Sequence, residues 1–449
     1  MNPPHLTRKI SLLQATSINM IDMVGIGPFV VMPLVIKTMG SGLFLWAWIF
    51  GAFTALADGM IWSELGAAFP QAGGSYNFLK QAYGEKWGPL MSFLFVWQTC
   101  LQAPLVMASG AIGFAQYFSY LIKLDPAGQK MVSGAVVLLV IILLYRRIET
   151  IGKISVLLWS GVIITMVWII VSGYTHRQYE YSFLPVGKQS MFGAAFSLLL
   201  GQASVKTIYS YLGYYNVCHL GSEIKNPQVN IPRSIFISIF GVTAMYLFMN
   251  ISIVSVVPWQ EAMNSHAIVS DFMEKIYGRN AAIVATILVM WIAFASLFAV
   301  LLGYSRVPYA AAVDGQFFPI FARLHPTKSF PQVSLLFIGG AGFAFSLLFK
   351  LSDVISAILA MRILVQFVAQ ALGIVRLRRV KGTGKLPFKM WLYPVPVIVS
   401  VLIWLFVLYS TGLKAVYGLL LAVAGMIMFY LSRNLWDKKR QVPQSEQAG

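Results

Sequence analysis

The chain has 449 residues, of which 58% are hydrophobic and only 11% are charged, and its mean hydropathy is +0.74. Soluble domains carry roughly a quarter charged residues, so the composition excludes a soluble globular protein and indicates an all-α integral membrane protein. The net charge of +18 is typical of basic cytoplasmic loops, and we expect no nucleic-acid partner.

Apolar stretches long enough to cross a bilayer predict about twelve transmembrane helices. In chain order they cover 12–36, 41–68, 88–120, 130–145, 151–173, 191–220, 233–257, 280–305, 332–350, 353–377, 391–411 and 413–434. A short amphipathic helix is also expected at 76–83, between the second and third spans. Residues 1–11 form a polar N-terminus, and 435–449 form a polar tail that we expect to be disordered.

Lys and Arg residues set the orientation, because cytoplasmic loops carry an excess of them. They gather in the loops on the side of the N-terminus, including the run from Arg376 to Lys389. An even number of spans puts both termini on that side. We therefore expect a multi-pass protein of the inner (plasma) membrane with both termini in the cytoplasm.

The first span contains Gly25-Ile26-Gly27-Pro28 near its middle. Glycine disfavours a helix by roughly 1 kcal/mol and proline by about 3 kcal/mol relative to alanine, and Pro28 cannot donate to the Val24 carbonyl. A break here would leave free amides on one side and free carbonyls on the other, which match the carboxylate and ammonium groups of a zwitterion. The alternative is a kinked packing helix with close-contact glycines.

The sixth span offers a second candidate interruption. Gly213 lies among tyrosines near its middle, with Ser210 and Asn216 on either side. A single glycine in an aromatic cluster is more often a packing feature. Helices one and six would, however, open the two halves of a five-plus-five inverted repeat, and interruptions at corresponding positions point to a binding site at the membrane midplane.

Four stretches, the first-span break among them, carry a resemblance to a known family. They are GIGPF, SELGAAFPQAGGSY at 63–76, SEIKNPQVNIPRSI at 222–235 and SRVPYAAAVDGQFFP at 305–319. In order and spacing they resemble the amino acid–polyamine–organocation (APC) family, most closely the bacterial relatives of the heteromeric neutral amino-acid exchangers. The resemblance implies the inverted repeat with discontinuous helices one and six, a transport core over 12–378, and two further helices within 379–434.

The resemblance also implies a secondary transporter that moves amino acids by alternating access, and not an enzyme. A substrate carboxylate would bind at the first-helix break and an amino group at helix-six carbonyls, at Gly25, Ile26, Gly27, Tyr209, Ser210 and Leu212. Tyr209 would also be an aromatic gate. Lys153 matches a buried lysine that replaces the bound cation of sodium-coupled relatives, which favours sodium-independent exchange or proton coupling. We expect no cofactor, metal ion or catalytic residue.

Charges inside a bilayer need a role, since each costs several kcal/mol unless it is paired or hydrated. Asp22 stands where the family commonly has a small residue, about one helical turn before the break. It could attract a substrate ammonium, exchange a proton, or pair with a base such as Lys153. Lys206 and Arg362 are candidate pairing or pathway-lining residues.

Three other functions stay open at this point. A polyamine or cationic amino-acid carrier could use Asp22 as its counter-charge. A membrane-embedded enzyme would need a convergent catalytic set, which the sequence does not offer. A non-transporting sensor would need an output domain from a partner. Small amino acids or amines and the lipid bilayer are therefore the expected partners, and the substrate side chain is undecided.

Overall fold

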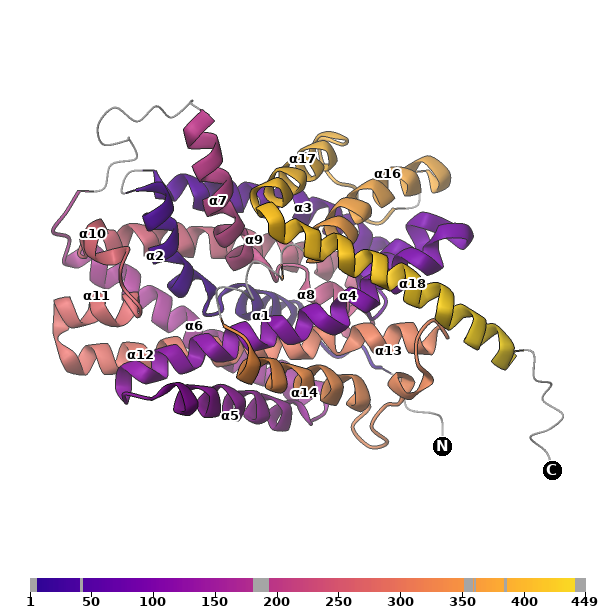
Figure 1. The fold of residues 1–449 in the computed structure, drawn as a ribbon, viewed down its shortest axis with the longest axis horizontal. Helices are drawn as coiled ribbons and strands as arrows, with labels where there is room; N and C mark the ends of the chain where they lie inside the picture. Colours follow the sequence, from indigo (N-terminus) through magenta and orange to yellow (C-terminus); the bar gives the residue numbers. More distant parts are fainter. Residues whose placement is uncertain are drawn as a thin grey trace.

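The computed structural model describes residues 6–40, 43–180, 194–350, 358, 361–382 and 386–440. Within these ranges the chain is almost entirely helical (Figure 1). The β-type pairing in the described ranges consists of two isolated bridges, one joining Ile10 to Ile224 and one joining Ala72 to Leu220. The expectation of an all-α protein is therefore confirmed.

The helices are numbered in chain order. They are α1 (Leu12–Met23), α2 (Gly27–Met39), α3 (Phe44–Ala68), α4 (Ser75–Leu121), α5 (Pro126–Leu144), α6 (Ile148–Thr175), α7 (Ala194–Tyr211), α8 (Asn216–His219), α9 (Pro227–Val254), α10 (Trp259–Ala262), α11 (Ile268–Tyr277), α12 (Arg279–Tyr304), α13 (Arg306–Val313), α14 (Gln332–Leu348), α16 (Ala369–Lys381), α17 (Val395–Ser410) and α18 (Ala415–Arg440). A π-helical turn, Ile363–Val368, leads into α16, and short 3₁₀ turns occupy Gly221–Glu223, Pro319–Ala322 and Gly412–Lys414.

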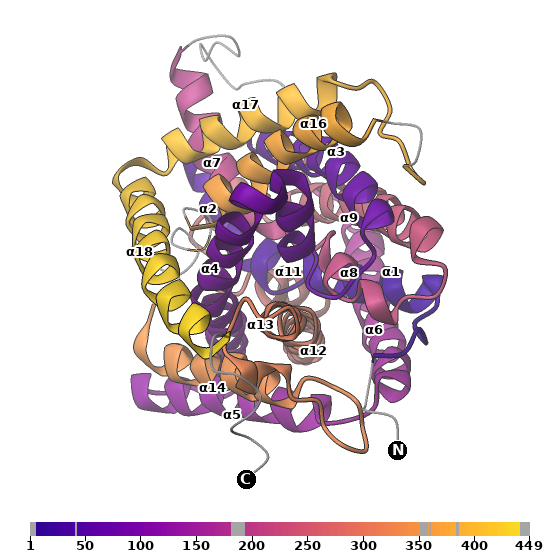
Figure 2. The ribbon, with the colours of Figure 1, turned by 90° about the vertical axis from the view of Figure 1, so that its right-hand side faces the viewer.

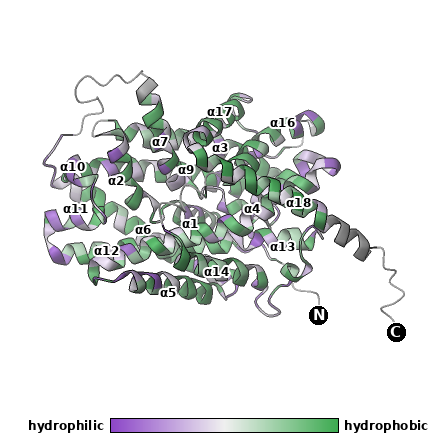
Figure 3. Cartoon of the chain, viewed as in Figure 1, coloured by the Kyte–Doolittle hydropathy of each residue, from purple (hydrophilic) through white to green (hydrophobic). Residues whose placement is uncertain are grey.

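The length and composition of the helices are those of a multi-pass membrane protein. Six described helices are long and apolar enough to cross a membrane, and the bent pair α1 and α2 makes a seventh if it is one span. Hydrophobic residues cover most of the helices, and hydrophilic residues gather at their ends (Figure 3). Outward-facing side chains such as Leu139 on α5 and Ile164 on α6 are 58% and 61% exposed, which is favourable in lipid but not in water.

Most of the predicted spans coincide with observed helices, and the differences lie at breaks and loops. The helix expected at 76–83 is confirmed as the first part of α4. This first part ends at Gly84, where φ is 67° and the backbone is not helical. The short helices α10, α11 and α13 occupy segments that the sequence predicts as loops. The sequence predicts a disordered tail from 435, whereas α18 continues to Arg440, and 441–449 lie outside the described residues. The count of twelve spans and the inverted repeat stay predictions.

Two groups of helices surround the centre of the molecule. In the first group α1 and α3 pack on α9, and α3 also packs on α7. In the second group α4, α5, α12 and α14 pack on one another. The short helix α8 lies beside α1 and contacts α9 and α12, so it sits where the two groups meet (Figures 1 and 2).

Candidate functional site

The first predicted break is present and leaves backbone donors free. α1 ends at Met23, α2 begins at Gly27, and the two helices are bent by 41°. The Val24 amide still donates to Met20 and the Gly25 amide donates to Met23. In the described part of the chain, the amides of Ile26 and Gly27 make no hydrogen bond. These free N–H groups leave a partial positive charge at the start of α2.

The second predicted break is also present. α7 ends at Tyr211, and a turn at 212–215 leads into the single-turn helix α8. Gly213 has a φ of 122°, which L-residues rarely adopt, so only glycine takes this conformation without strain. The Gly213 carbonyl accepts from the Asn216 amide at 2.9 Å. The helix is thus interrupted at the position that the sequence indicated.

One tyrosine of α9 ties the two breaks together. The Tyr246 hydroxyl lies 2.7 Å from the Met23 carbonyl oxygen and 2.9 Å from the Ser210 carbonyl oxygen. A second tie comes from Asn19, whose side-chain oxygen accepts from the Val217 amide at 2.8 Å. Because these donors and acceptors are buried, the bonds hold the interrupted segments in a fixed mutual position.

The two breaks open onto one central cavity, which has a volume of about 40 Å³. Its walls come from α1, the start of α2, α4, the end of α7, the 212–215 turn, α12 and Arg362. The lining residues are Asp22, Met23, Gly25, Ile26, Gly27, Val106, Ser109, Gly110, Tyr209, Ser210, Leu212, Gly213, Tyr215, Ser296, Leu297, Val300, Tyr304 and Arg362. All seven substrate-binding candidates from the sequence and the pathway candidate Arg362 are in this set.

Tyr209 lies over the first break. Its hydroxyl is 2.7 Å from the Ser109 hydroxyl on α4, which holds the ring across the cavity. A Cβ atom added at Gly27 would lie 3.3 Å from both the Tyr209 ring and the Ser210 hydroxyl. The glycine therefore allows the free amides and the aromatic ring to face each other closely.

Asp22 and Arg362 are the charged side chains of the cavity. Asp22 interacts with the Asn216 side chain and with the charge on Arg362, but the two form no ion pair within 4 Å among the described residues. Arg362 donates instead to Gln366 at 2.9 Å and to the Tyr304 hydroxyl. The tyrosine rings beside it add cation–π contacts. Both charges are thus available to a ligand in the cavity.

The two predicted lysines do not reach the cavity. Lys206 on α7 is half-buried and donates to the Thr38 hydroxyl at 3.0 Å. Lys153 is exposed on α6, so the expectation that it is buried is wrong. The neighbouring Gly152 faces α1, since an added Cβ would lie 2.9 Å from the Gln14 amide group. A step of one residue along a helix rotates the next side chain by about 100°, which turns Lys153 outward.

The sequence analysis missed the wall opposite the breaks. Ser109 on α4 and Ser296 on α12 face the cavity, and Ser296 lies within 3.5 Å of the Asp22 carbonyl oxygen. Tyr215 and Tyr304 complete the surroundings of Arg362, and their hydroxyls are 3.5 Å apart. A lone serine in a long apolar span carries no local signal of this kind. Only the packing of α12 against α1 and α4 reveals it.

Comparison with known proteins gives the family. Residues 10–430 match the family model for amino acid permeases. The chain belongs to the amino acid permease family. Members of this family are transporters and not enzymes, so the membrane-enzyme alternative is excluded.

The permease is similar to several characterised exchangers and transporters. It is 25% identical to the serine/threonine exchanger SteT of Bacillus subtilis over 438 residues, which are 95% of this chain and 97% of the relative. It is 25% identical to the human cystine/glutamate transporter over 449 residues, 97% of this chain and 87% of the relative. It is 25% identical to the mouse Asc-type amino acid transporter 1 over 439 residues, 95% of this chain and 81% of the relative.

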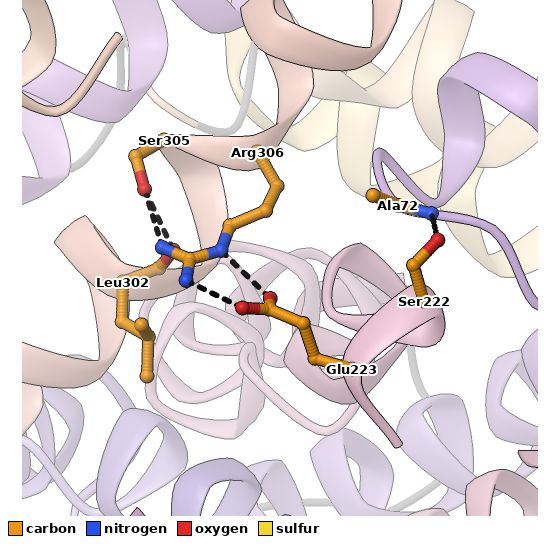
Figure 4. A network of polar contacts seen from close by, with 6 residues as sticks. All are labelled: Ala72, Ser222, Glu223, Leu302, Ser305 and Arg306. Atoms are coloured by element: carbon orange, nitrogen blue, oxygen red, sulfur yellow. Dashed lines mark hydrogen bonds and ion pairs between the residues drawn. The ribbon is translucent and has the colours of Figure 1, made fainter. Parts of the chain in front are cut away.

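The stretches that carry the family resemblance meet in the structure of the permease. Glu223 and Arg306 are fully buried, and the guanidinium donates two bonds to the carboxylate at 2.9 and 3.0 Å (Figure 4). Beside them the Ser222 hydroxyl accepts from the Ala72 amide at 2.9 Å. These bonds join the segment after α8 to α13 and to the segment before α4. They therefore help to hold the second break, between α7 and α8, in place.

A buried carboxylate on α3 also helps to hold the second break, between α7 and α8, in place. Asp58 accepts from Trp62 at 2.8 Å, from Tyr214 at 2.5 Å and from Ser400 at 3.1 Å. Tyr214 is the residue after Gly213, so Asp58 fixes the turn that faces the cavity. Glu64, also on α3, pairs with Arg378 and accepts from the Met390 amide.

Proposed function

We propose that this permease moves small neutral amino acids across the cell membrane by alternating access. The observation that carries the proposal is that free amides of Ile26 and Gly27 face the same cavity as Asp22 and the end of α7. A substrate carboxylate would accept from these amides, where the dipole of α2 is positive. The ammonium group would lie towards Asp22 and the carbonyls near Leu212.

The charge balance of the cavity favours a net-neutral substrate. Asp22 and Arg362 are the charged residues that line the cavity, and their formal charges sum to zero. A zwitterionic amino acid leaves this balance unchanged. A polyamine would add two or more positive charges beside Arg362, where a low dielectric strengthens repulsion. This observation counts against the polyamine alternative.

The same balance supports sodium independence. Arg362 places a positive charge in the cavity and offsets its one carboxylate, and this charge repels a cation bound in the same cavity. Lys153 gives no support here because it is exposed. Exchange as the mode of transport is supported by the relative SteT, which is described as a serine/threonine exchanger. Sodium-independent exchange is therefore the mode that we propose.

The small volume of the cavity supports a mechanism that includes opening. A space of about 40 Å³ has room for on the order of three water molecules, which is less than an amino acid needs. Substrate entry thus requires Tyr209 and the half-helices to move. The group containing α1, α3, α7 and α9 would rock against the group containing α4, α5, α12 and α14, with α1 and α12 in contact between them.

A thermal-stability screen of the purified permease tests the proposed substrate class. A ligand that binds the folded state raises the apparent melting temperature, and the stabilisation grows with the logarithm of the ligand concentration over Kd. We expect stabilisation by serine, alanine or threonine and none by putrescine. Stabilisation by putrescine or arginine alone would overturn the proposal in favour of a cationic substrate.

A further inference from the structure

A second, larger cavity lies away from the site, at the surface of the helix pair α5 and α14. These helices lie side by side at the edge of the molecule (Figures 1 and 2). The cavity has a volume of about 740 Å³. Its lining residues are Ile141, Ile142, Tyr145, Arg146, Arg147, Thr150, Thr327, Lys328 and Leu336. It shares no residue with the central cavity.

The polar side of this surface cavity carries three basic residues and no acidic one. Arg146 and Arg147 are exposed, and none of the three forms an ion pair among the described residues. The acidic residue nearest in sequence, Glu149, pairs with Lys9 at 3.5 Å and does not line the cavity. The positive charges are therefore left for an outside partner.

Contacts with Tyr145 fix the position of Lys328 in this surface cavity. Lys328 donates to the Tyr145 carbonyl oxygen at 2.8 Å, and its ammonium lies 4.8 Å from the centre of the Tyr145 ring. This ties the segment before α14 to the end of α5. The long helix α6 begins at Ile148, directly after the arginines, and has no side-chain cap. Its first-turn amides and the Thr150 hydroxyl add donors to the same side.

The other side of the surface cavity is apolar and continues onto the lipid-facing surface. Ile142 is 67% exposed and Leu336 is 48% exposed, and Leu139 on the same face of α5 extends the apolar strip. A free phosphate or nucleotide would gain nothing from this strip. A phospholipid would place its phosphate among the basic residues and its acyl chains along α5 and α14.

We infer that this cavity binds the headgroup of an anionic phospholipid. Two arginines and a lysine bind a phosphate through charge-assisted hydrogen bonds, and basic pockets between helices near the membrane surface take such headgroups. The bound lipid would bridge α5, the start of α6 and α14, of which α5 and α14 belong to one helix group. The inference does not depend on the transported substrate.

The test measures lipid binding to the purified full-length permease in a neutral detergent, by native mass spectrometry and by thermal stability. The probes are phosphatidylglycerol, phosphatidylcholine and inorganic phosphate. We expect bound phosphatidylglycerol and a raised melting temperature, with neither effect from the other two probes. Equal binding of phosphatidylcholine would overturn the inference, and stabilisation by inorganic phosphate alone would replace the lipid by a free anion.

A pair of matched variants separates the cavity from general surface charge. Arg146→Gln with Arg147→Gln removes two charges from the cavity, and Arg233→Gln with Arg379→Gln removes two exposed charges elsewhere. The first variant is expected to weaken phosphatidylglycerol binding by about tenfold or more, and the second by less than about twofold. Both should melt like the parent without lipid. Equal weakening in the two variants, or none in the first, would contradict the inference.

Discussion

Gly213 and Asp22 are in direct contact where the two interrupted helices cross. A Cβ atom added at Gly213 would lie 2.9 Å from the Asp22 carboxyl carbon and 2.8 Å from the Met23 amide nitrogen. The positive φ of Gly213 makes the turn possible, and the absence of a side chain makes the approach possible. This contact places the carboxylate of Asp22 at the wall of the central cavity.

Gly213→Ala is expected to destabilise the permease and to abolish uptake. The substitution adds backbone strain of about 1–3 kcal/mol and forces the end of α1 away from the turn. Thermal unfolding in detergent and uptake into proteoliposomes measure the two effects. Gly340→Ala is the matched control, because Gly340 lies in α14 with nothing within 4 Å of an added Cβ. Equal melting temperatures for the two variants would show that the contact is not close.

Gly25→Ala is expected to impair transport through a clash with α12. An added Cβ would lie 2.5 Å from the Ser296 hydroxyl oxygen and 2.9 Å from the Ser296 Cβ. Ser296→Gly removes both atoms and should restore part of the lost activity. A double-mutant cycle on the initial uptake rate measures this coupling. Strictly additive losses would mean that the first break and α12 do not meet in the transporting protein.

Asp22→Asn is expected to weaken amino-acid binding by roughly ten- to a hundredfold, since a hydrogen bond to a charged group contributes about 1.5–3 kcal/mol. The measurement is the substrate concentration that gives half-maximal uptake. Glu85→Gln removes an exposed carboxylate outside the cavity and should have no effect. If Asp22→Asn binds its substrate as tightly as the parent, Asp22 does not face the ammonium group.

Several of these features could be predicted from the sequence because they depend on local backbone chemistry. Glycine and proline disfavour a helix wherever they stand, so the first break could be indicated from Gly25, Gly27 and Pro28. Gly213 alone is a weak signal, and its correspondence to the first break in the expected repeat is what indicates the second break. Arg362 could be singled out because a charge inside a bilayer needs a partner. The structure places it in the cavity.

Other features depend on which face of a helix turns inward, and the sequence does not encode this simply. α6 is apolar on both its lipid-facing and its buried sides, so no polar stripe tells the two apart. The family resemblance implies a buried Lys153, and the sequence of α6 offers no contrast that would show the residue to be exposed. The same lack of contrast hides Ser109 and Ser296, which face the cavity only because α4 and α12 pack against the break.

Glu223→Ala is expected to lower the stability of the permease by about 3–5 kcal/mol, because it leaves the buried guanidinium of Arg306 without its partner. Glu261→Ala breaks the exposed pair with Lys275 and should cost no more than about 1 kcal/mol. Thermal unfolding of both variants in the same detergent makes the comparison. A similar small loss for both would indicate that water reaches the Glu223–Arg306 pair.

Counterflow into proteoliposomes tests the central claim most directly. Vesicles that contain the purified permease are loaded with unlabelled serine, alanine or putrescine, or left empty, and the uptake of labelled serine is followed with and without a sodium gradient. We predict rapid uptake into vesicles loaded with serine or alanine, little into empty or putrescine-loaded vesicles, and no effect of sodium. Uptake that strictly requires sodium, or that occurs only against putrescine, would contradict the account.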